Sequence, residues 1–386
     1  MIERDISRQA LKYLEWFPIV SMTGPRQSGK STLVKNLFPD FEYLNLEDEG
    51  TYNLARTDPP GFIYDRPHAL IIDEAQRVPE LFHALQVASD DQGTPGQYVL
   101  SGSQNFLMLS NITQSLAGRV GLLKLLPFSY REALRARPEL SVDEFMITGG
   151  YPRLYDASIP PVVYFENYLA TYVQRDVAGL VSGRNLSIFL TFITLCAQAC
   201  GSLLNVTRLA RDVDVSRQTA DSWLSILESS YILFRLQPYH ANLRKRLTKA
   251  PKIYFYDTGL LCHLLGLKTV EQLRDSPMRG PIFENLVIVE TIKRHLNRGE
   301  SPNLTFYRDS SGIEVDMVDS TDPAAVELVE VKSARSFQPS FTKHLASVGD
   351  ELNITPEHRY VVMRSQRSTT VSGTKIWSVR DWLDRE

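Results

Sequence analysis

The fold is decided by a stretch near the start of the chain, Gly24-Pro25-Arg26-Gln27-Ser28-Gly29-Lys30-Ser31. It fills every position of the pattern G-x-x-x-x-G-K-S/T, in which loop amides and a helix N-terminus surround phosphate groups. Residues 18–22 before it are an apolar run short enough for a buried strand, and residues 31–37 after it place three apolar side chains on one helical face. Since strand, loop and helix follow in the required order, the sequence predicts a nucleotide-binding loop.

The loop supplies most of the candidate ligands for a nucleotide. In the expected geometry Lys30 reaches the β- and γ-phosphates, and the hydroxyl of Ser31 ligates Mg²⁺. The predicted cofactors are therefore ATP and Mg²⁺. The predicted nucleotide-binding residues are Gly24, Pro25, Arg26, Gln27, Ser28, Gly29, Lys30, Ser31, Thr32 and Ser103. The alternative, a solvent-exposed turn rich in glycine and serine, is disfavoured by the strand and the helix on either side.

A second stretch supplies the other half of such a site. It reads Ala69-Leu70-Ile71-Ile72-Asp73-Glu74, an apolar run that ends in two acids. Asp73, at the carboxyl end of this strand, is predicted to hold Mg²⁺ through water or Ser31, and Glu74 to orient and deprotonate the attacking water. An apolar strand ending in acids is weak evidence by itself, but after a complete phosphate loop it predicts hydrolysis of the nucleotide.

Two further features connect the site with a class of ATPases and with assembly. Residues 97–101 form another strand, whose polar end holds Ser103, a candidate sensor of the γ-phosphate. An additional strand between the loop strand and the acidic strand indicates the P-loop class that includes AAA+ motors. Arg119 is the candidate arginine that reaches a neighbour's γ-phosphate, which predicts a homo-oligomeric ring with a hexamer as the candidate size. The alternative for Arg119 is a surface or intradomain ion pair.

Composition limits the other classes of function. The chain has 386 residues, of which 43% are hydrophobic and 23% charged, and its net charge is −3. It therefore has no overall attraction for nucleic acid, and any such surface must be local. Its most apolar stretch, residues 188–200, is interrupted by polar side chains and is shorter than the roughly 20 residues of a membrane span. No N-terminal segment resembles a signal peptide, and the three cysteines have no metal-binding spacing. These features predict a cytoplasmic protein with reduced thiols and no membrane partner.

The middle of the chain has the pattern of a winged helix. A helix over residues 206–213 is followed by Ser216, a good N-cap, and by a second helix from Arg217 with apolar side chains at i, i+3, i+4 and i+7. Apolar strands at residues 231–236 and 252–256 complete the pattern.

Charge supports a DNA-binding role for this region. Between Arg208 and Lys252 there are nine basic and four acidic residues, a local charge of +5. Clustered lysine and arginine side chains are what binding to a phosphate backbone requires. The predicted DNA-binding residues are Arg217, Gln218, Arg244, Lys245, Arg246 and Lys249. The alternative is a winged helix that binds protein, with its basic loop exposed to solvent.

The final third holds a second candidate catalytic centre. A strand pair over residues 305–316 ends in Asp316, and the next strand places Glu330 and Lys332 on one face. These three residues resemble the core of the PD-(D/E)xK nucleases, in which two carboxylates share Mg²⁺ and the lysine orients or activates water. Glu284, from the preceding helix, is the candidate additional metal ligand. The alternative is a nuclease-shaped domain that binds DNA without cutting it.

Several sequence blocks in fixed order extend the comparison to nearly the whole chain. After the loop and the acidic strand, these blocks cover residues 100–103, 115–119, 127–132, 149–152, 172–177 and 251–260. With them the chain resembles the prokaryotic AAA+-like ATPases that carry a C-terminal DUF4143 region. The predicted fold class is α/β with four parts: an AAA+-type P-loop ATPase core over residues 1–126, a helical lid over 127–185, a winged-helix domain over 186–270, and a PD-(D/E)xK restriction-endonuclease-like α/β domain over 271–386.

The sequence leaves three functions open. In the first, ATP binding and hydrolysis at Lys30, Asp73 and Glu74 change how the winged helix and the nuclease-like domain engage DNA, so that ATP turnover is coupled to DNA remodelling. In the second, the nucleotide state controls a protein–protein interface in a signalling or defence switch, and the nuclease-like domain is inactive. In the third, the ATPase only licenses a metal-dependent nuclease. DNA-stimulated ATP turnover favours the first function, and nucleotide-dependent partner binding without such stimulation favours the second.

Overall fold

The computed structural model describes residues 2–103, 115–157, 159–172, 177, 181, 186–239 and 250–385. The chain divides into two compact units. The first contains residues 1–127 with the short segments 229–231 and 296–299. The second contains residues 128–228, 232–295 and 300–386. No helix of the described part of the chain is both long enough and apolar enough to cross a membrane.

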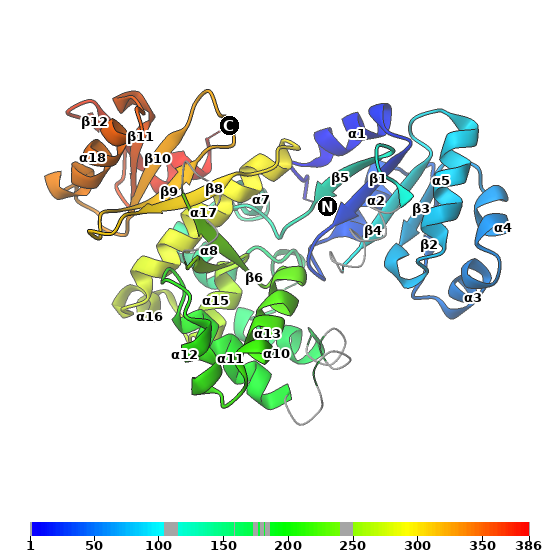
Figure 1. Cartoon of the computed structure of the whole chain (residues 1–386), viewed down its shortest axis with the longest axis horizontal. Helices are drawn as coiled ribbons and strands as arrows, with labels where there is room; N and C mark the ends of the chain where they lie inside the picture. Colours follow the sequence, from blue (N-terminus) through cyan, green and yellow to red (C-terminus); the bar gives the residue numbers. More distant parts are fainter. Residues whose placement is uncertain are drawn as a thin grey trace. The chain divides into compact units, whose positions relative to one another are not determined.

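The first unit is built on a parallel sheet. Its strands are β1 (Ile19–Thr23), β2 (Glu42–Asn45), β3 (Leu70–Asp73), β4 (Tyr98–Gly102) and β5 (Val120–Lys124). They lie in the order β2-β3-β4-β1-β5 (Figure 1), and every neighbouring pair is parallel. The loop strand β1 and the acidic strand β3 are therefore separated by β4, as the sequence predicts for the additional-strand class of P-loop proteins.

Helices cover both faces of this sheet because successive side chains of a strand point to opposite faces. Ile19 of β1 packs into one cluster with side chains of the helices α3 (Glu49–Thr57), α4 (Pro59–Tyr64) and α5 (Leu81–Gln92). Val20, the next residue, packs into the other cluster with side chains of α1 (Ser7–Trp16) and α2 (Lys30–Leu37). The unit is thus a three-layer α/β sandwich, which holds the carboxyl ends of its parallel strands at one edge.

The second unit begins as a set of helices. They are α7 (Tyr130–Ala136), α8 (Val142–Thr148), α9 (Arg153–Asp156), α10 (Pro161–Tyr172), α11 (Leu186–Gln198), α12 (Val206–Asp212), α13 (Arg217–Ser229), α15 (Thr258–Leu264), α16 (Val270–Asp275) and α17 (Arg279–Asn297). In α10 the side chains of Phe165, Leu169 and Tyr172 are buried. The helices α12 and α13 lie where the sequence predicts a helix pair.

Two of the sequence blocks that carry the family resemblance meet inside this unit. Asp257 begins α15, and its side chain accepts hydrogen bonds from the amides of Leu260 (2.9 Å) and Gly150 (2.7 Å). A Cβ on Gly259 would lie 2.6 Å from the backbone nitrogen of Gly149, closer than atoms can approach. Burial raises the pKa of the Asp257 carboxyl. These blocks therefore have a structural role in joining α8 to α15.

The second unit also contains a mixed sheet. Its strands are β6 (Leu233–Pro238), β7 (Lys252–Phe255), β8 (Leu304–Arg308), β9 (Glu314–Asp319), β10 (Glu327–Lys332), β11 (Arg359–Met363), β12 (Thr369–Val371) and β13 (Thr374–Ser378), in the order β12-β13-β11-β10-β9-β8-β6-β7. The helix α18 (Lys343–Glu351) contributes side chains to the core of this sheet, and α19 (Val379–Leu383) follows β13.

The strand β6 is the link between the helical part of the unit and this sheet. It pairs with β7 in a hairpin, and Gln237 lies opposite Thr305 where β6 pairs in parallel with β8 (Figure 1). One sheet thus contains strands from both sides of the predicted boundary at residue 271. This continuity places β7 in the same sheet as the strands that carry Asp316, Glu330 and Lys332.

Candidate functional site

Two glycines give the phosphate loop its shape. Gly24 follows β1, and a Cβ there would lie 2.1 Å from the carbonyl oxygen of Leu125. Gly29 precedes α2 with a φ of 92°, in the left-handed region that glycine adopts without strain. The loop can therefore pack closely at the end of the sheet and turn sharply into the helix. Pro25, Arg26 and Gln27 lie in the loop, Ser28 is fully buried, and Thr32 is exposed in the first turn of α2.

Lys30 lies across the loop. Its Nζ donates hydrogen bonds to the carbonyl oxygens of Gly24 (2.9 Å) and Pro25 (2.8 Å). Arg4, which no motif in the sequence indicates, donates to the carbonyl oxygens of Ser28 (2.9 Å) and Leu126 (2.7 Å) from a buried position. The guanidinium of Arg4 therefore fixes the loop to the strand end.

Asp73 lies at the carboxyl edge of the sheet beside the loop. Three hydroxyl groups donate hydrogen bonds to its carboxylate: Ser31 (2.6 Å), Tyr43 (2.5 Å) and Ser101 (2.5 Å). Burial would raise the pKa of Asp73, but the hydrogen bonds from Ser101, Ser31 and Tyr43 and the charge of Lys30 outweigh it and lower this pKa. Asp73 is therefore a buried anion beside the Ser31 hydroxyl, an oxygen pair that fits Mg²⁺.

Glu74 and Ser103 meet at the same edge. The Glu74 carboxylate accepts hydrogen bonds from Gln76 Nε2 (2.5 Å) and from Ser103 Oγ (3.2 Å). The backbone of Glu74 has a φ of 55°, which turns the chain directly after β3. The structure thus brings together the loop, Asp73, Glu74 and Ser103, all of which the sequence assigns to the nucleotide. It adds Tyr43 and Gln76, to which no role at the site was assigned from the sequence.

Arg119 lies at the amino-terminal ends of the strands, opposite the end that carries the phosphate loop. Its carbonyl oxygen accepts a hydrogen bond from the amide of Ile19, at the start of β1, whereas the phosphate loop follows the end of that strand. The length of β1, roughly 15 Å, therefore separates Arg119 from the loop. Its guanidinium forms two hydrogen bonds with Asp90 (2.5 and 2.8 Å). From this end of the strand Arg119 cannot reach the nucleotide of its own chain. Two roles remain open for Arg119: contact with the nucleotide of a neighbouring chain, or the ion pair with Asp90.

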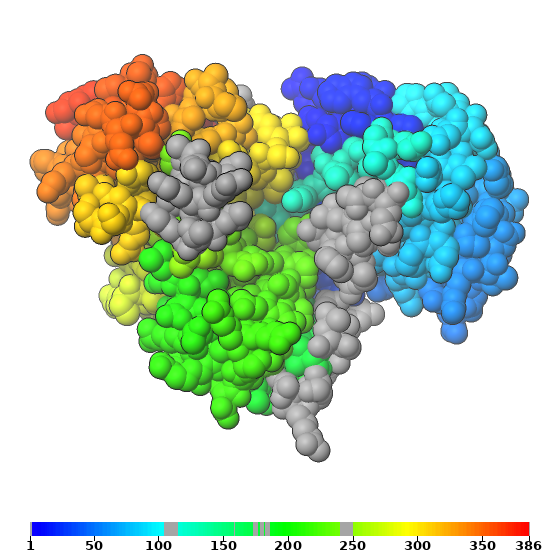
Figure 2. Space-filling view, viewed as in Figure 1, coloured from blue at the N-terminus to red at the C-terminus, as the bar shows by residue number. Residues whose placement is uncertain are grey.

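The predicted DNA-binding residues lie only partly within the described structure. Arg217 and Gln218 are exposed in the first turn of α13, and Arg217 lies 3.7 Å from Asp221. In Figure 2 the elements α11 to α13 form a continuous part of the visible face. Arg244, Lys245, Arg246 and Lys249 lie outside the described residues.

The four carboxyl-terminal candidates come together in the second unit. Lys332 Nζ forms an ion pair with Glu330 and lies 3.9 Å from Asp316 Oδ2. The amide of Val331 donates to the same oxygen of Asp316 at 2.8 Å. Glu284 faces this group from α17, and burial and the charge of Asp316 raise the pKa of both Glu284 and Glu330. The spacing in the sequence thus places these side chains in one buried cluster.

Lys252, one of the basic residues counted in the local charge of +5, also belongs to this cluster. Its Nζ lies 2.6 Å from Glu314, 3.0 Å from Glu284 and 3.9 Å from Asp316, and the residue is 3% exposed. Burial lowers the pKa of Lys252, but the charges of Glu284, Asp316 and Glu314 outweigh this effect and hold the pKa above its usual range. Within the described residues, no group of three His, Cys, Asp or Glu side chains is arranged to hold a metal ion.

Known families match three parts of the chain. An AAA domain matches residues 17–134, a domain of unknown function, DUF8612, matches residues 139–271, and a second domain of unknown function, DUF4143, matches residues 279–382. An uncharacterized protein of Mycobacterium tuberculosis is 31% identical over 318 residues, which cover 81% of this chain and 70% of the relative. The chain belongs to the AAA-type ATPases that carry a C-terminal DUF4143 region.

Two other relatives are less similar to this chain. An uncharacterized protein of Haemophilus influenzae is 22% identical and matches over 99% of this chain and 98% of its own length. An uncharacterized protein of Methanocaldococcus jannaschii is 24% identical over 76% of this chain and 70% of its own length.

Solved structures with some similarity are P-loop proteins. A Walker-type ATPase of Pyrococcus abyssi has a TM-score of 0.47 and 16% identity, over 69% of this chain and 96% of that one. The replication initiator DnaA, bound to AMPPCP and single-stranded DNA, has a TM-score of 0.31 and 13% identity, over 58% of this chain and 86% of that one. Since both TM-scores are low, the assignment to the ATPase family depends on the sequence matches and the strand order.

Proposed function

We propose that this protein hydrolyses ATP at the edge of the first sheet and couples the turnover to the remodelling of DNA. The AAA domain match supports binding and hydrolysis of ATP. One observation carries the assignment of the residues. The Ser31 hydroxyl donates a hydrogen bond of 2.6 Å to the Asp73 carboxylate, Glu74 follows Asp73 in the chain, and Lys30 lies against the carbonyls of the phosphate loop. This is the arrangement that phosphoryl transfer to water requires.

Each residue of the site has a role that follows from its position. Ser31 and Asp73 would hold Mg²⁺, which neutralises charge on the phosphates when it is bound. Lys30 would exchange its two loop carbonyls for phosphate oxygens. Glu74 would orient the attacking water and accept its proton, while Ser103 would contact the γ-phosphate and report its loss.

Glu74 provides the first prediction. We expect Glu74→Gln to bind ATP as the wild type does but to lower turnover by roughly 100-fold or more, because the amide cannot accept a proton. Turnover is measured by phosphate release and binding by a fluorescent ATP analogue. Glu80→Gln is a matched control, because Glu80 is exposed in the turn directly before α5, and it should leave both quantities unchanged. Wild-type turnover in Glu74→Gln would refute the role of this residue as a base.

The DNA part of the proposal rests on the local charge between Arg208 and Lys252 and on the exposed residues of α13. Five members of that count have an acidic partner within 4 Å in the described structure: Arg208, Arg211, Arg217, Arg235 and Lys252. Lys252 is also buried, so the contacts with DNA would have to come from the other basic residues. The test is a survey of ATP turnover with branched, ended and single-stranded DNA. Stimulation by at least one of these forms, absent in Glu74→Gln, is the expected result. No stimulation, together with nucleotide-dependent binding of a protein partner, would favour the signalling or defence switch.

A further inference from the structure

Lys252 occupies the centre of the buried carboxylate cluster. The nearest oxygens of Glu314, Glu284 and Asp316 lie 2.6, 3.0 and 3.9 Å from its Nζ. The Phe306 ring lies below it, with its centroid 5.4 Å from the Nζ. The ammonium thus makes close contacts with carboxylates from α17 and from β9.

The backbone keeps Lys252 in this place. The residue lies opposite Leu236 in the β6–β7 hairpin, and a bridge pairs it with Leu203 on its other side. Tyr254, two residues further along the same strand, donates its hydroxyl to Glu284. An ammonium that is 3% exposed can leave three carboxylates only at a high desolvation cost to all four groups.

A divalent metal does not fit this cluster as it stands. Mg²⁺ requires oxygen ligands at about 2.0–2.1 Å in near-octahedral arrangement. An ion between Glu284 and Asp316 would lie close to the positive charge of Lys252, which repels it. Lys332 belongs to the nuclease pattern and is one-third exposed, whereas Lys252 is an additional cation that this pattern does not include.

We propose that Lys252 is a built-in cation that replaces a divalent metal in this cluster, so that the DUF4143 region does not cleave phosphodiesters by metal-dependent chemistry. The four carboxylates Glu284, Glu314, Asp316 and Glu330 are then a structural network balanced by Lys252, Lys332 and Arg308. This inference is independent of the proposed coupling of ATP to DNA, because the nucleotide site uses other residues in the first unit.

The experiment measures binding of Mn²⁺ by electron paramagnetic resonance, with the full chain and no nucleotide. The wild type should show no saturable binding that depends on Asp316. Lys252→Met keeps the length of the side chain and removes its charge, and it should tighten Mn²⁺ binding by on the order of 100-fold, because a unit charge about 4 Å away is removed. Lys252→Arg keeps the charge and is the matched control, so its Mn²⁺ binding should be no tighter than that of the wild type. Asp316→Asn added to Lys252→Met should abolish the gain.

Two outcomes would overturn the proposal. Saturable binding of Mn²⁺ by the wild type that is lost in Asp316→Asn would show that the cluster holds a metal despite Lys252. A folded Lys252→Met protein, judged by circular dichroism, that gains no binding would show that Lys252 is not what excludes the ion. If Lys252→Met does not fold, the proposal is tested by the wild type alone, through the presence or absence of Mn²⁺ binding that depends on Asp316. Binding that survives Asp316→Asn lies outside the cluster and agrees with the proposal.

Discussion

Gly259 illustrates how single residues hold distant segments of this chain together. It follows Asp257, whose side chain bonds the amide of Gly150, and its α-carbon faces the backbone of Thr148 and Gly149. A side chain at this position would collide with main-chain atoms, which cannot rotate away as a flexible side chain can. The absence of a Cβ is therefore a packing requirement at Gly259.

We predict that Gly259→Ala lowers the free energy of unfolding by about 2 kcal/mol or more, because the new methyl group forces α8 and α15 apart. Urea denaturation measures this change. Gly280→Ala is the control, since a Cβ at this helical position has no heavy atom within 4 Å, and it should raise stability by up to about 1 kcal/mol. An equal effect of the two substitutions would contradict the packing argument.

Residues that act through local sequence were predictable, and those that act across the fold were not. Lys30, Asp73 and Glu74 belong to contiguous patterns, so their meeting at one sheet edge follows from the parallel strands that carry them. Arg4 and Tyr43 reach the site from elements without a motif. The cluster around Lys252 was not predicted, because its charge was counted along the chain, whereas its acidic partners come from α17 and β9.

At the scale of elements, short apolar runs ending in polar residues identified the parallel strands well. The strands β1, β3 and β4 lie within one residue of their predicted bounds. The pairing of β6 with β8 was not predicted, because it joins strands that are far apart in the chain and involves only two residue pairs. No local pattern specifies such a contact, since it depends on the packing of everything in between.

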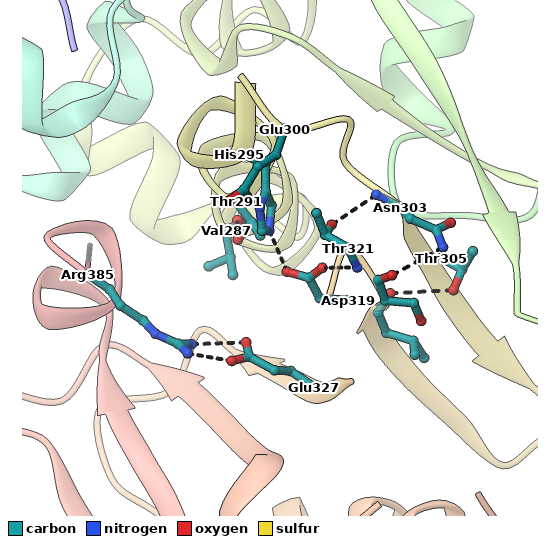
Figure 3. Close-up of polar contacts among 12 residues, drawn as sticks. Val287, Thr291, His295, Glu300, Asn303, Thr305, Asp319, Thr321, Glu327 and Arg385 are labelled. Carbon is teal, nitrogen blue, oxygen red and sulfur yellow. Dashed lines mark hydrogen bonds and ion pairs between the residues drawn. The ribbon is translucent and has the colours of Figure 1, made fainter. Parts of the chain in front are cut away.

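The end of α17 contains a histidine between two acids. His295 contacts Glu300 through Nδ1 (2.6 Å) and Asp319 through Nε2 (2.7 Å) (Figure 3). Burial lowers the pKa of His295, but the hydrogen bonds to Asp319 and Glu300 outweigh it and raise this pKa, despite the nearby charge of Arg294. The imidazole, whose charged form these acids favour, therefore ties the helix to the end of β9.

This tie predicts a pH dependence of stability. Because the pKa of His295 is higher in the folded than in the unfolded chain, its contribution is complete below the unfolded value of about 6.5 and is lost as the pH rises through the folded value. Replacing His295 by Gln should therefore cost more stability at about pH 6 than at about pH 9, by on the order of 1 kcal/mol. His83→Gln, on the exposed face of α5, should show no such difference. A cost that is independent of pH would show that the charge of His295 is unimportant.

At the scale of the whole molecule, the position of Arg119 makes assembly testable. If Arg119 completes a neighbour's site, Arg119→Ala should keep the affinity for ATP and lower turnover by about 1,000-fold or more. Mixing it with Lys30→Ala should restore part of the activity, since one intact composite site can form at an interface. Phosphate release from the mixture measures the rescue.

Asp90 supplies the control for this prediction. Asp90→Asn removes the partner of Arg119 but leaves the guanidinium, and exposed ion pairs of this kind contribute little to stability, roughly 0–1 kcal/mol. Its turnover should stay near that of the wild type. A loss as large as that of Arg119→Ala, or no rescue in a mixture shown to assemble, would assign Arg119 to the ion pair alone.

The pairing of β6 with β8 also decides how this protein can be divided. A fragment of residues 271–386 would lack β6 and β7, so the edge of β8 would present unpaired amides and carbonyls to other copies, a known route to aggregation. It would also lose Lys252 and leave Glu284, Glu314 and Asp316 without their main counter-charge. We expect light scattering to show that this fragment self-associates, whereas a fragment of residues 128–386, which keeps all of the second unit, stays monodisperse. The family boundary drawn at residue 279 is thus a poor place to cut the chain.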